Sequence, residues 1–249
     1  MDADLRRRMN NMLKLCKVED NQNEYDCPIC EDRGYVFKQD EYGYTVAVPC
    51  ECLGKKQSVE KLNKSGLSDV FKKKTFKTFT ATEKYQIEAK KKAIEYCNNF
   101  EKTNASIILS GQPGAGKTHL GIAIMLKLLE NNIGCVYKEY TSMLIDLKQS
   151  CMDQVNYIKE LEKYTNPRVL FLDDFLKSKP SDADLKYIYK VINTRYLKQM
   201  PVIISTEKSI NEIISWDEAV GSRLIEMSQG NIIEFKNNIN NNYRLRGIV

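Results

Sequence analysis

One eight-residue segment, GQPGAGKT at residues 111–118, restricts the fold of this chain more than any other. It fits the pattern G-x-x-x-x-G-K-[ST], it directly follows the apolar stretch SIILS, and it opens the amphipathic stretch HLGIAIMLKLLE. In that context the pattern predicts a loop whose backbone N–H groups surround a phosphate at the N-terminus of a helix. The sequence therefore predicts a strand, a phosphate-binding loop and a helix, in that order.

The individual residues of this loop have roles that follow from the chemistry of phosphate binding. Lys117 is expected to reach the β- and γ-phosphate oxygens of ATP, and the Thr118 hydroxyl to bind magnesium. The sole histidine of the chain, His119, comes next and is expected to line the site in a structural role. The residues of this segment predicted to bind nucleotide are Gly111, Gln112, Pro113, Gly114, Ala115, Gly116, Lys117, Thr118 and His119.

A second motif, RVLFLDDF at residues 168–175, ends an apolar stretch with two carboxylates. Magnesium keeps several waters and takes few protein ligands, so one acidic residue at the end of a neighbouring strand can complete its site. Asp173 is expected to hold the metal through a water, and Asp174 to polarise the attacking water as general base. Aspartate in place of the more usual glutamate shortens the reach, which predicts slow hydrolysis. The alternative is a pair of capping carboxylates after a core strand.

Further positions are candidates for sensing or completing the nucleotide site. The stretch PVIISTE ends in polar residues, so Ser205 or Thr206 is expected to lie between the magnesium site and the γ-phosphate. Arg223 in VGSRLIE is a candidate arginine finger for a neighbouring subunit, with an ordinary surface ion pair as the alternative. Arg244 and Arg246 are candidates for closing over the nucleotide from the C-terminal tail.

Four cysteines form two close pairs, CPIC and CEC, near the N-terminus. Each pair can supply two sulfurs to one tetrahedral ion, and zinc is the natural occupant of a four-cysteine site. About thirty residues cannot bury enough surface to fold alone, so the metal would supply folding energy in a structural role. An iron–sulfur cluster and unligated thiols are the alternatives. The predicted zinc ligands are Cys27, Cys30, Cys50 and Cys52.

The chain divides by composition into three regions. Residues 1–54 are predicted to form an amphipathic helix over about the first 20 residues, followed by the cysteine unit with a hairpin of strands at 35–38 and 44–48. Residues 55–80 are predicted to be a basic linker. Residues 81–249 alternate apolar strands with amphipathic helices from position 104 onward, which predicts an α/β domain with a mostly parallel sheet between helices.

The basic segment has two interpretations. Residues 55–92 contain twelve lysines against four acidic residues. Aromatic side chains are interleaved with these lysines at Phe71, Phe76, Phe79 and Tyr85. Lysines neutralise phosphates and aromatic rings stack on bases, so the segment could bind single-stranded nucleic acid. Alternatively, it is a solvated linker whose aromatic rings dock on the ATP-binding domain.

Length and charge set only broad limits. The 249 residues include 42% hydrophobic residues and carry a formal net charge of +5, which permits a nucleic-acid partner without requiring one. No stretch has the apolar run of a signal peptide or a membrane span, so we expect a cytoplasmic protein with no membrane partner.

Together, GQPGAGKTHL, RVLFLDDF, NTRYLKQMPVIIST, GSRLIE and YRLRG, preceded by CPIC and CEC, resemble the DnaC/DnaI-type replicative helicase loaders. The resemblance covers most of the chain. It implies an AAA+ P-loop core that oligomerises in an ATP-dependent way on DNA, and an N-terminal domain that grips a hexameric replicative DNA helicase and delivers it onto single-stranded DNA. A replication initiator is a possible further partner implied by the resemblance.

The resemblance also assigns roles at matching positions. Lys117 and Thr118 match the Walker A residues, and Asp173 and Asp174 the Walker B pair. Sensor 1 falls at Ser205 or Thr206, the arginine finger at Arg223 and sensor 2 at Arg246. This chain has Glu207 where many relatives have asparagine after the sensor strand.

The short C-terminal tail implies that no helical lid follows the core, so weak ATP hydrolysis by a monomer is expected. Two other functions share these ATPase motifs. One is an IstB-like transposition helper that forms filaments on duplex DNA, and the other is an adaptor that binds ATP as a switch and scarcely hydrolyses it.

Overall fold

The structure, a computed structural model, describes residues 27–31, 33–39, 43–50, 66–178, 180–235 and 243. The chain divides after Gly54 into two units, Met1–Gly54 and Lys55–Val249. The helix predicted over the first 20 residues lies outside the described residues, as do Cys52 and Arg246. The prediction that no helical lid follows the core concerns residues after 235, of which only Tyr243 is described. Within the described part of the chain, no helix is both long enough and apolar enough to cross a membrane.

The first unit contains the predicted hairpin. Strand β1, Tyr35–Gln39, pairs antiparallel with β2, Thr45–Pro49, so that Val36 lies opposite Val48. Most hairpin residues are exposed, and Val36 packs against a small buried cluster of three cysteines. A hairpin with so little buried apolar surface is not stable by itself in water.

The second unit contains a five-stranded sheet. Its strands are β3 (Ile107–Gly111), β4 (Cys135–Glu139), β5 (Val169–Phe175), β6 (Val202–Thr206) and β7 (Ile232–Phe235). All neighbouring strands are parallel, in the order β4-β5-β6-β3-β7. The carboxyl ends of the strands therefore meet at one edge of the sheet, where ligands bind in folds of this kind. The predicted parallel α/β architecture is confirmed.

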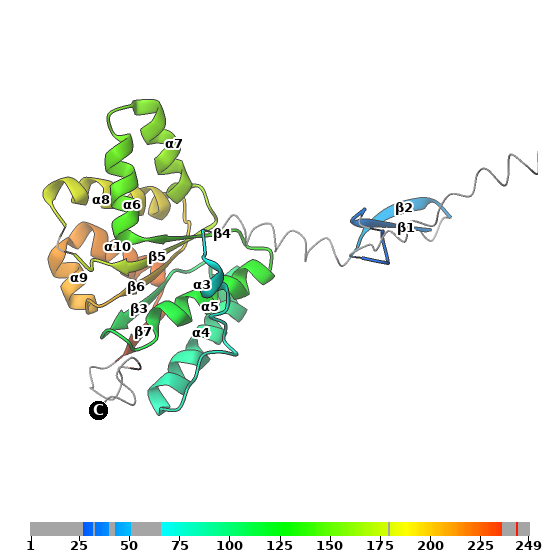
Figure 1. Cartoon of the computed structure of the whole chain (residues 1–249), viewed down its shortest axis with the longest axis horizontal. Helices are drawn as coiled ribbons and strands as arrows, with labels where there is room; N and C mark the ends of the chain where they lie inside the picture. Colours follow the sequence, from blue (N-terminus) through cyan, green and yellow to red (C-terminus); the bar gives the residue numbers. More distant parts are fainter. Residues whose placement is uncertain are drawn as a thin grey trace, which may run out of the picture. The chain divides into compact units, whose positions relative to one another are not determined.

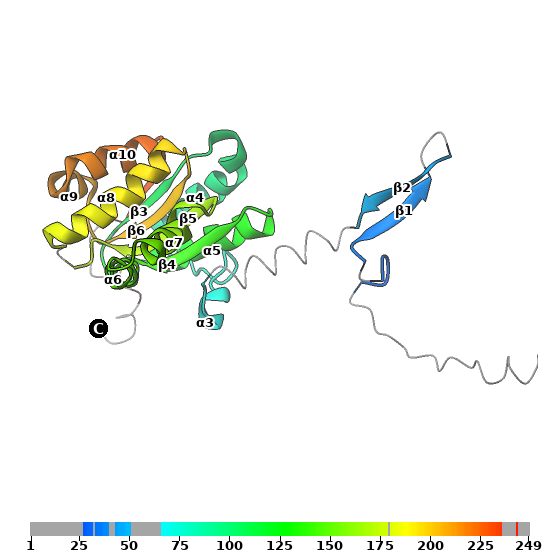
Figure 2. The same cartoon turned by 90° about the horizontal axis from the view of Figure 1, so that it is seen from above.

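Helices cover both faces of this sheet (Figure 1 and Figure 2). Helices α3 (Asp69–Lys72), α4 (Lys84–Thr103) and α5 (Lys117–Glu130) belong to one side. The other side is covered by α6 (Tyr140–Ser150), α7 (Gln154–Thr165), α8 (Asp182–Leu197), α9 (Ile210–Trp216) and α10 (Glu218–Ser228). The core therefore has two halves, one on each face of the sheet.

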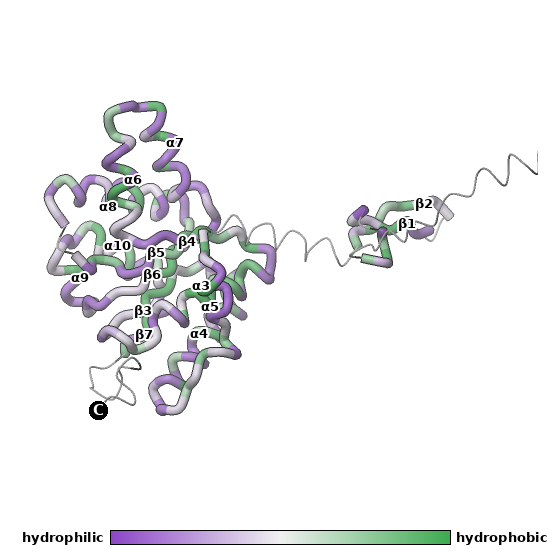
Figure 3. The backbone as a smooth tube through the Cα atoms, in the orientation of Figure 1, coloured by the Kyte–Doolittle hydropathy of each residue, from purple (hydrophilic) through white to green (hydrophobic). Residues whose placement is uncertain are grey.

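Alternation along the strands produces these two halves. Leu109 of β3 and Phe171 of β5 pack with α4 and α5, whereas Ile108 and Leu170 pack with the helices of the opposite face. Successive side chains of a strand point to opposite faces, and a sheet covered on both faces needs apolar residues at every position. The central strands are accordingly among the most hydrophobic parts of the chain (Figure 3).

Residues 66–80, expected at the end of a linker, are part of the second unit. Leu67 and Phe79 are buried in the core cluster of α4 and α5, and Phe71 and Phe76 pack against it. Of the two interpretations of the basic segment, docking of the aromatic rings on the core is the one observed. The sequence left both interpretations open because single aromatic residues alternate with lysines that remain largely at the surface.

Arg195 of α8 is a fully buried cation at the opposite edge of the sheet from the phosphate loop. Its guanidinium donates hydrogen bonds to the carbonyl oxygens of Tyr164, Pro167, Arg168 and Pro201 at 2.7–3.2 Å. Burial lowers its pKa to about 9. The last turn of α7 and the loops before β5 and β6 thus share one charged donor, which fixes them relative to one another.

We predict that Arg195→Leu destabilises the second unit by about 3 kcal/mol or more, because buried carbonyl groups lose their donor. The free energy of unfolding should be measured in urea for both this variant and Arg168→Leu. The Arg168 side chain is exposed and serves as the control. Equal stability of the two variants would contradict this role for Arg195.

Candidate nucleotide-binding site

A cavity of about 360 Å³ lies at the carboxyl edge of the sheet, beside the loop between β3 and α5. It is lined by Lys74, Thr78, Phe79, Thr80, Gln86, residues 113–119, Asp174, Lys177, Glu207 and Tyr243. Of the residues predicted at the phosphate loop, 113–119 therefore share one cavity with Asp174, the second carboxylate of the RVLFLDDF motif, whereas Gly111 and Gln112 do not line it. Seven further lining residues had no predicted role at the nucleotide site, namely Lys74, Thr78, Phe79, Thr80, Gln86, Lys177 and Tyr243.

The loop has the shape that its glycines permit. Gly111, Gly114 and Gly116 have positive φ angles of 135°, 75° and 99°. A Cβ atom on Gly111 would lie 2.3 Å from the carbonyl oxygen of Phe235, so only glycine fits where β3 passes β7. Lys117 begins α5 and donates from Nζ to the carbonyl oxygens of Gly111 at 2.6 Å and Gln112 at 2.8 Å. The helix N-terminus thus faces the cavity with its positive dipole end.

Asp173 is the centre of a hydrogen-bond network at the end of β5. Its carboxylate accepts hydrogen bonds from Thr118 Oγ1 at 3.0 Å, from Tyr137 OH at 3.1 Å and from Ser205 Oγ. Only 4% of the residue is exposed, and this burial raises its pKa, while the hydroxyl donors Ser205 and Thr118 oppose the rise. The network joins α5, β4, β5 and β6 at the predicted magnesium position.

The two candidate sensor hydroxyls differ in their partners. Ser205 donates to Asp173 and accepts a hydrogen bond from the Asp174 backbone N–H at 3.0 Å. Thr206 instead donates to the carbonyl oxygen of Phe175 at 2.7 Å and accepts from the Lys208 backbone N–H. Ser205 is therefore part of the predicted metal site, and Thr206 fixes the end of β6. Glu207, the next residue, lines the cavity.

His119 connects residues 75–79 to the phosphate-loop helix. Its Nε2 lies 3.1 Å from the Thr75 carbonyl oxygen and 3.3 Å from Thr78 Oγ1, and its ring meets that of Phe79 edge-on. Burial lowers its pKa. A Cβ atom on Gly116 would lie 2.9 Å from the Phe79 ring, so this aromatic side chain packs directly on the phosphate loop. The interleaved aromatic residues were the only sequence signal for this wall of the cavity.

Arg223 does not line the cavity. It lies on α10, where it donates to Asn193 Oδ1 at 3.0 Å and to the Ala219 carbonyl oxygen at 2.6 Å. Its guanidinium also stacks on the rings of Tyr189 and Tyr196. From the tail, Tyr243 reaches the phosphate loop, because its backbone N–H donates to the Gly114 carbonyl oxygen at 3.0 Å.

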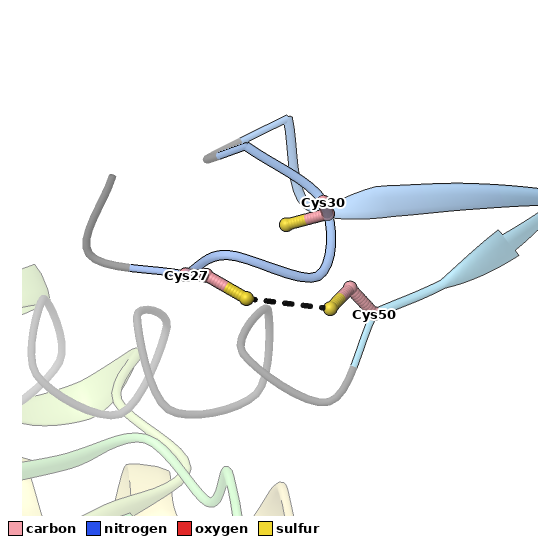
Figure 4. Close-up of side chains that lie close together, drawn as sticks. All are labelled: Cys27, Cys30 and Cys50. Atoms are coloured by element: carbon pink, nitrogen blue, oxygen red, sulfur yellow. Dashed lines mark hydrogen bonds between the residues drawn. The ribbon is translucent and has the colours of Figure 1, made fainter. Parts of the chain in front are cut away.

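The first unit gathers three of the four predicted zinc ligands. The sulfur atoms of Cys27, Cys30 and Cys50 all lie within 4.8 Å of one another and are buried, with Cys27 Sγ 3.7 Å from Cys50 Sγ. Figure 4 shows them converging from the loop before β1 and from the end of β2. Sulfurs bound to one tetrahedral zinc ion at about 2.3 Å would stand roughly 3.8 Å apart. The backbone N–H of Gly34 also donates to Cys30 Sγ, and such a hydrogen bond favours the thiolate form. The donor set therefore fits zinc.

Two relatives cover nearly the whole chain. The phage-like element PBSX protein XkdC of Bacillus subtilis (strain 168) is 31% identical in an alignment that covers 98% of this chain and 96% of XkdC. The uncharacterized protein YqaM of the same strain is 31% identical in an alignment that covers 87% of this chain and 84% of YqaM.

Among solved structures, the crystal structure of the DnaC helicase loader is similar to this chain with a TM-score of 0.60 and 23% identity. The match covers 68% of this chain and all of that chain. This likeness concerns the fold, and it confirms the predicted AAA+ P-loop architecture. Residues 54–246 match the family described as IstB-like ATP binding protein. The chain therefore belongs to the IstB-like family of ATP-binding proteins.

Proposed function

We propose that this protein is an ATP-dependent helicase loader, which binds a hexameric replicative DNA helicase through its N-terminal unit and delivers it onto single-stranded DNA. The observation that carries the proposal is the presence, in one chain of the IstB-like family, of a phosphate-loop cavity and a separate unit with clustered cysteines. The similarity to the DnaC helicase loader fold supports it.

ATP and magnesium would bind at the carboxyl edge of the sheet. Lys117 and the loop amides would hold the β- and γ-phosphates, while Thr118 and Asp173 would hold magnesium, the latter through a water. Asp174 would polarise the attacking water, and Ser205 would register the state of the metal site. Magnesium supplies charge neutralisation for the phosphate oxygens when it is bound.

Hydrolysis would depend on a second copy of the chain. Arg223 lies outside the described cavity, on α10, and would act as an arginine finger on the nucleotide of a neighbouring subunit. The rings of Tyr189 and Tyr196 and the hydrogen bond to Asn193 hold its guanidinium in place. This arrangement favours ATP-dependent assembly and weak turnover by a monomer.

The two units differ in net charge, which supports helicase binding by the first unit and DNA binding by the second. Residues 1–54 contain 7 Lys and Arg against 11 Asp and Glu, a net charge of −4, whereas residues 55–249 contain 31 against 22, a net charge of +9. A basic ATPase unit suits DNA, and an acidic unit does not. The hairpin exposes Tyr35 and Phe37, large apolar rings of the kind enriched in protein interfaces.

The N-terminal cysteine unit distinguishes the loader from a transposition helper with the same ATPase motifs. Zinc bound by Cys27, Cys30, Cys50 and Cys52 would hold this unit together. Cys52 lies outside the described residues, so its part in the site is a proposal from sequence alone.

The function is tested by co-purification with a replicative helicase from the same organism, in ATP and in ADP. The full chain and a chain starting at Lys55 should be compared, because the division between the units falls there. We expect the full chain to retain the helicase and the shortened chain to lose it. Absence of binding by the full chain in both nucleotides would contradict the loader function.

Cys27→Ser should release the zinc and unfold the first unit, because the hairpin buries little surface, while ATP affinity of the second unit stays within about twofold. Zinc content by mass spectrometry and ATP binding by calorimetry check this. Cys97→Ser, at a buried cysteine of α4 far from the cluster in sequence, is the control and should keep the metal. Unchanged zinc content in Cys27→Ser would show that this residue is not a ligand.

Asp173→Asn should stabilise the nucleotide-free protein at neutral pH. Because the pKa of Asp173 is raised in the folded protein, burial of its negative charge lowers the free energy of unfolding most above that raised pKa. Below the ordinary aspartate pKa near 4 the carboxyl group is neutral in both states, and this destabilisation is absent. The melting temperature in EDTA should therefore exceed wild type at pH 7, by about 2–4 °C per kcal/mol relieved, with the difference shrinking towards pH 4. Asp69→Asn, which removes an exposed ion pair with Lys72, should change the melting temperature little. A lower melting temperature for Asp173→Asn at pH 7 would contradict the prediction.

A further inference from the structure

Lys177 lies at the catalytic end of the cavity without a role in any of the motifs described above. It follows β5 by two residues and lines the same cavity as Lys117, Thr118 and Asp174. Its Nζ lies 2.5 Å from Asp174 Oδ2. The cation therefore contacts the carboxylate that we propose as the general base.

The backbone is bent to allow this contact. Asp174 and Leu176 have positive φ angles of 54° and 58°, and the Lys177 backbone N–H donates to the Asp174 carbonyl oxygen at 3.1 Å. Non-glycine residues rarely adopt such angles, and they gather at functional sites. The turn brings the Lys177 side chain back beside Asp174, whose own backbone N–H is fixed by Ser205.

The side chains of Lys177 and Asp174 differ in exposure and in conformational freedom. The Lys177 side chain is 52% exposed, whereas that of Asp174 is 25% exposed. The ammonium group stands on a four-carbon stem with three rotatable donors, so it can exchange one acceptor for another without backbone movement. Asp174, in contrast, is half-buried within β5, where its backbone N–H donates to the Ser205 hydroxyl.

The charges around the cavity give the lysine a second acceptor. Lys74, Lys117 and Lys177 are the cations among the described lining residues, and Asp174 and Glu207 the carboxylates. A γ-phosphate carries more negative charge than one carboxylate, and Lys–phosphate bonds are charge-assisted. Bound ATP would therefore compete with Asp174 for the Lys177 ammonium, and ADP, lacking that group, would not.

We propose that Lys177 senses the γ-phosphate: without it, Lys177 holds Asp174 in an ion pair, and with ATP bound it transfers to the γ-phosphate and releases Asp174. The freed carboxylate accepts a proton from the attacking water as the new O–P bond forms and the bond to the leaving ADP breaks. The inference rests on the proposed ATP site and adds a residue to it.

The test compares ATP and ADP affinity, with magnesium, in the full-length protein. Lys177→Gln should weaken binding of a non-hydrolysable ATP analogue about tenfold while ADP affinity stays within about twofold, because only the γ-phosphate contact is lost. Lys177→Arg should retain most of the preference for the ATP analogue over ADP, because arginine keeps the positive charge. Lys163→Gln is the matched control: Lys163 also forms a 2.5 Å ion pair with an acidic residue three positions away, but outside the described cavity.

The outcomes separate this inference from the proposed site. If wild type binds the analogue and Lys177→Gln has an unchanged ratio of the two affinities, or loses both equally, Lys177 does not sense the γ-phosphate. If wild type binds no nucleotide, or Lys117→Ala binds it as wild type does, the ATP site itself is wrong. Circular dichroism of each variant establishes that the fold is retained.

Discussion

The candidate nucleotide site is organised around one buried carboxylate, that of Asp173. Burial disfavours its charge, and the hydroxyl groups of Thr118, Ser205 and Tyr137 offset that cost with hydrogen bonds from three different elements. The buried Asp173 carboxylate has no cation partner among the described residues, so its negative charge reduces the stability of the protein. A bound divalent metal ion would offset this loss. The network also fixes the relative positions of β4, β5, β6 and α5, so the site and the core share the same constraint.

The parts of this site that the sequence could predict are those with local patterns. The phosphate loop, the strand that ends in Asp173 and the order of strands and helices follow from short motifs and from hydrophobic periodicity. The difference between Ser205 and Thr206 could not be predicted, because both are hydroxyls at a strand end and only the three-dimensional partners distinguish them. Tyr137 and Lys177 reach the site through tertiary proximity and a bent backbone, for which a single sequence carries no signal.

The sequence left two interpretations of the segment at 66–80 open for a related reason, and docking on the core was one of them. Its apolar contacts are made by Leu67, Phe71, Phe76 and Phe79, which are separated by lysines and show no helical or strand periodicity. Aromatic side chains bury much surface each, so a few suffice to dock such a segment. In the chain this segment precedes the ATPase core and follows the cysteine unit. The wall of the nucleotide cavity is thus built from the stretch that leads to the core from the first unit.

The cavity beside the phosphate loop is proposed to bind ATP together with magnesium at Asp173. The most direct measurement is calorimetric titration of ATP into the full-length protein, with magnesium and with EDTA. We expect ATP to bind at least about tenfold more tightly with magnesium, because the cation offsets the cost of burying the Asp173 carboxylate and neutralises the phosphates. Equal affinity in the two conditions, or no binding in either, would contradict it.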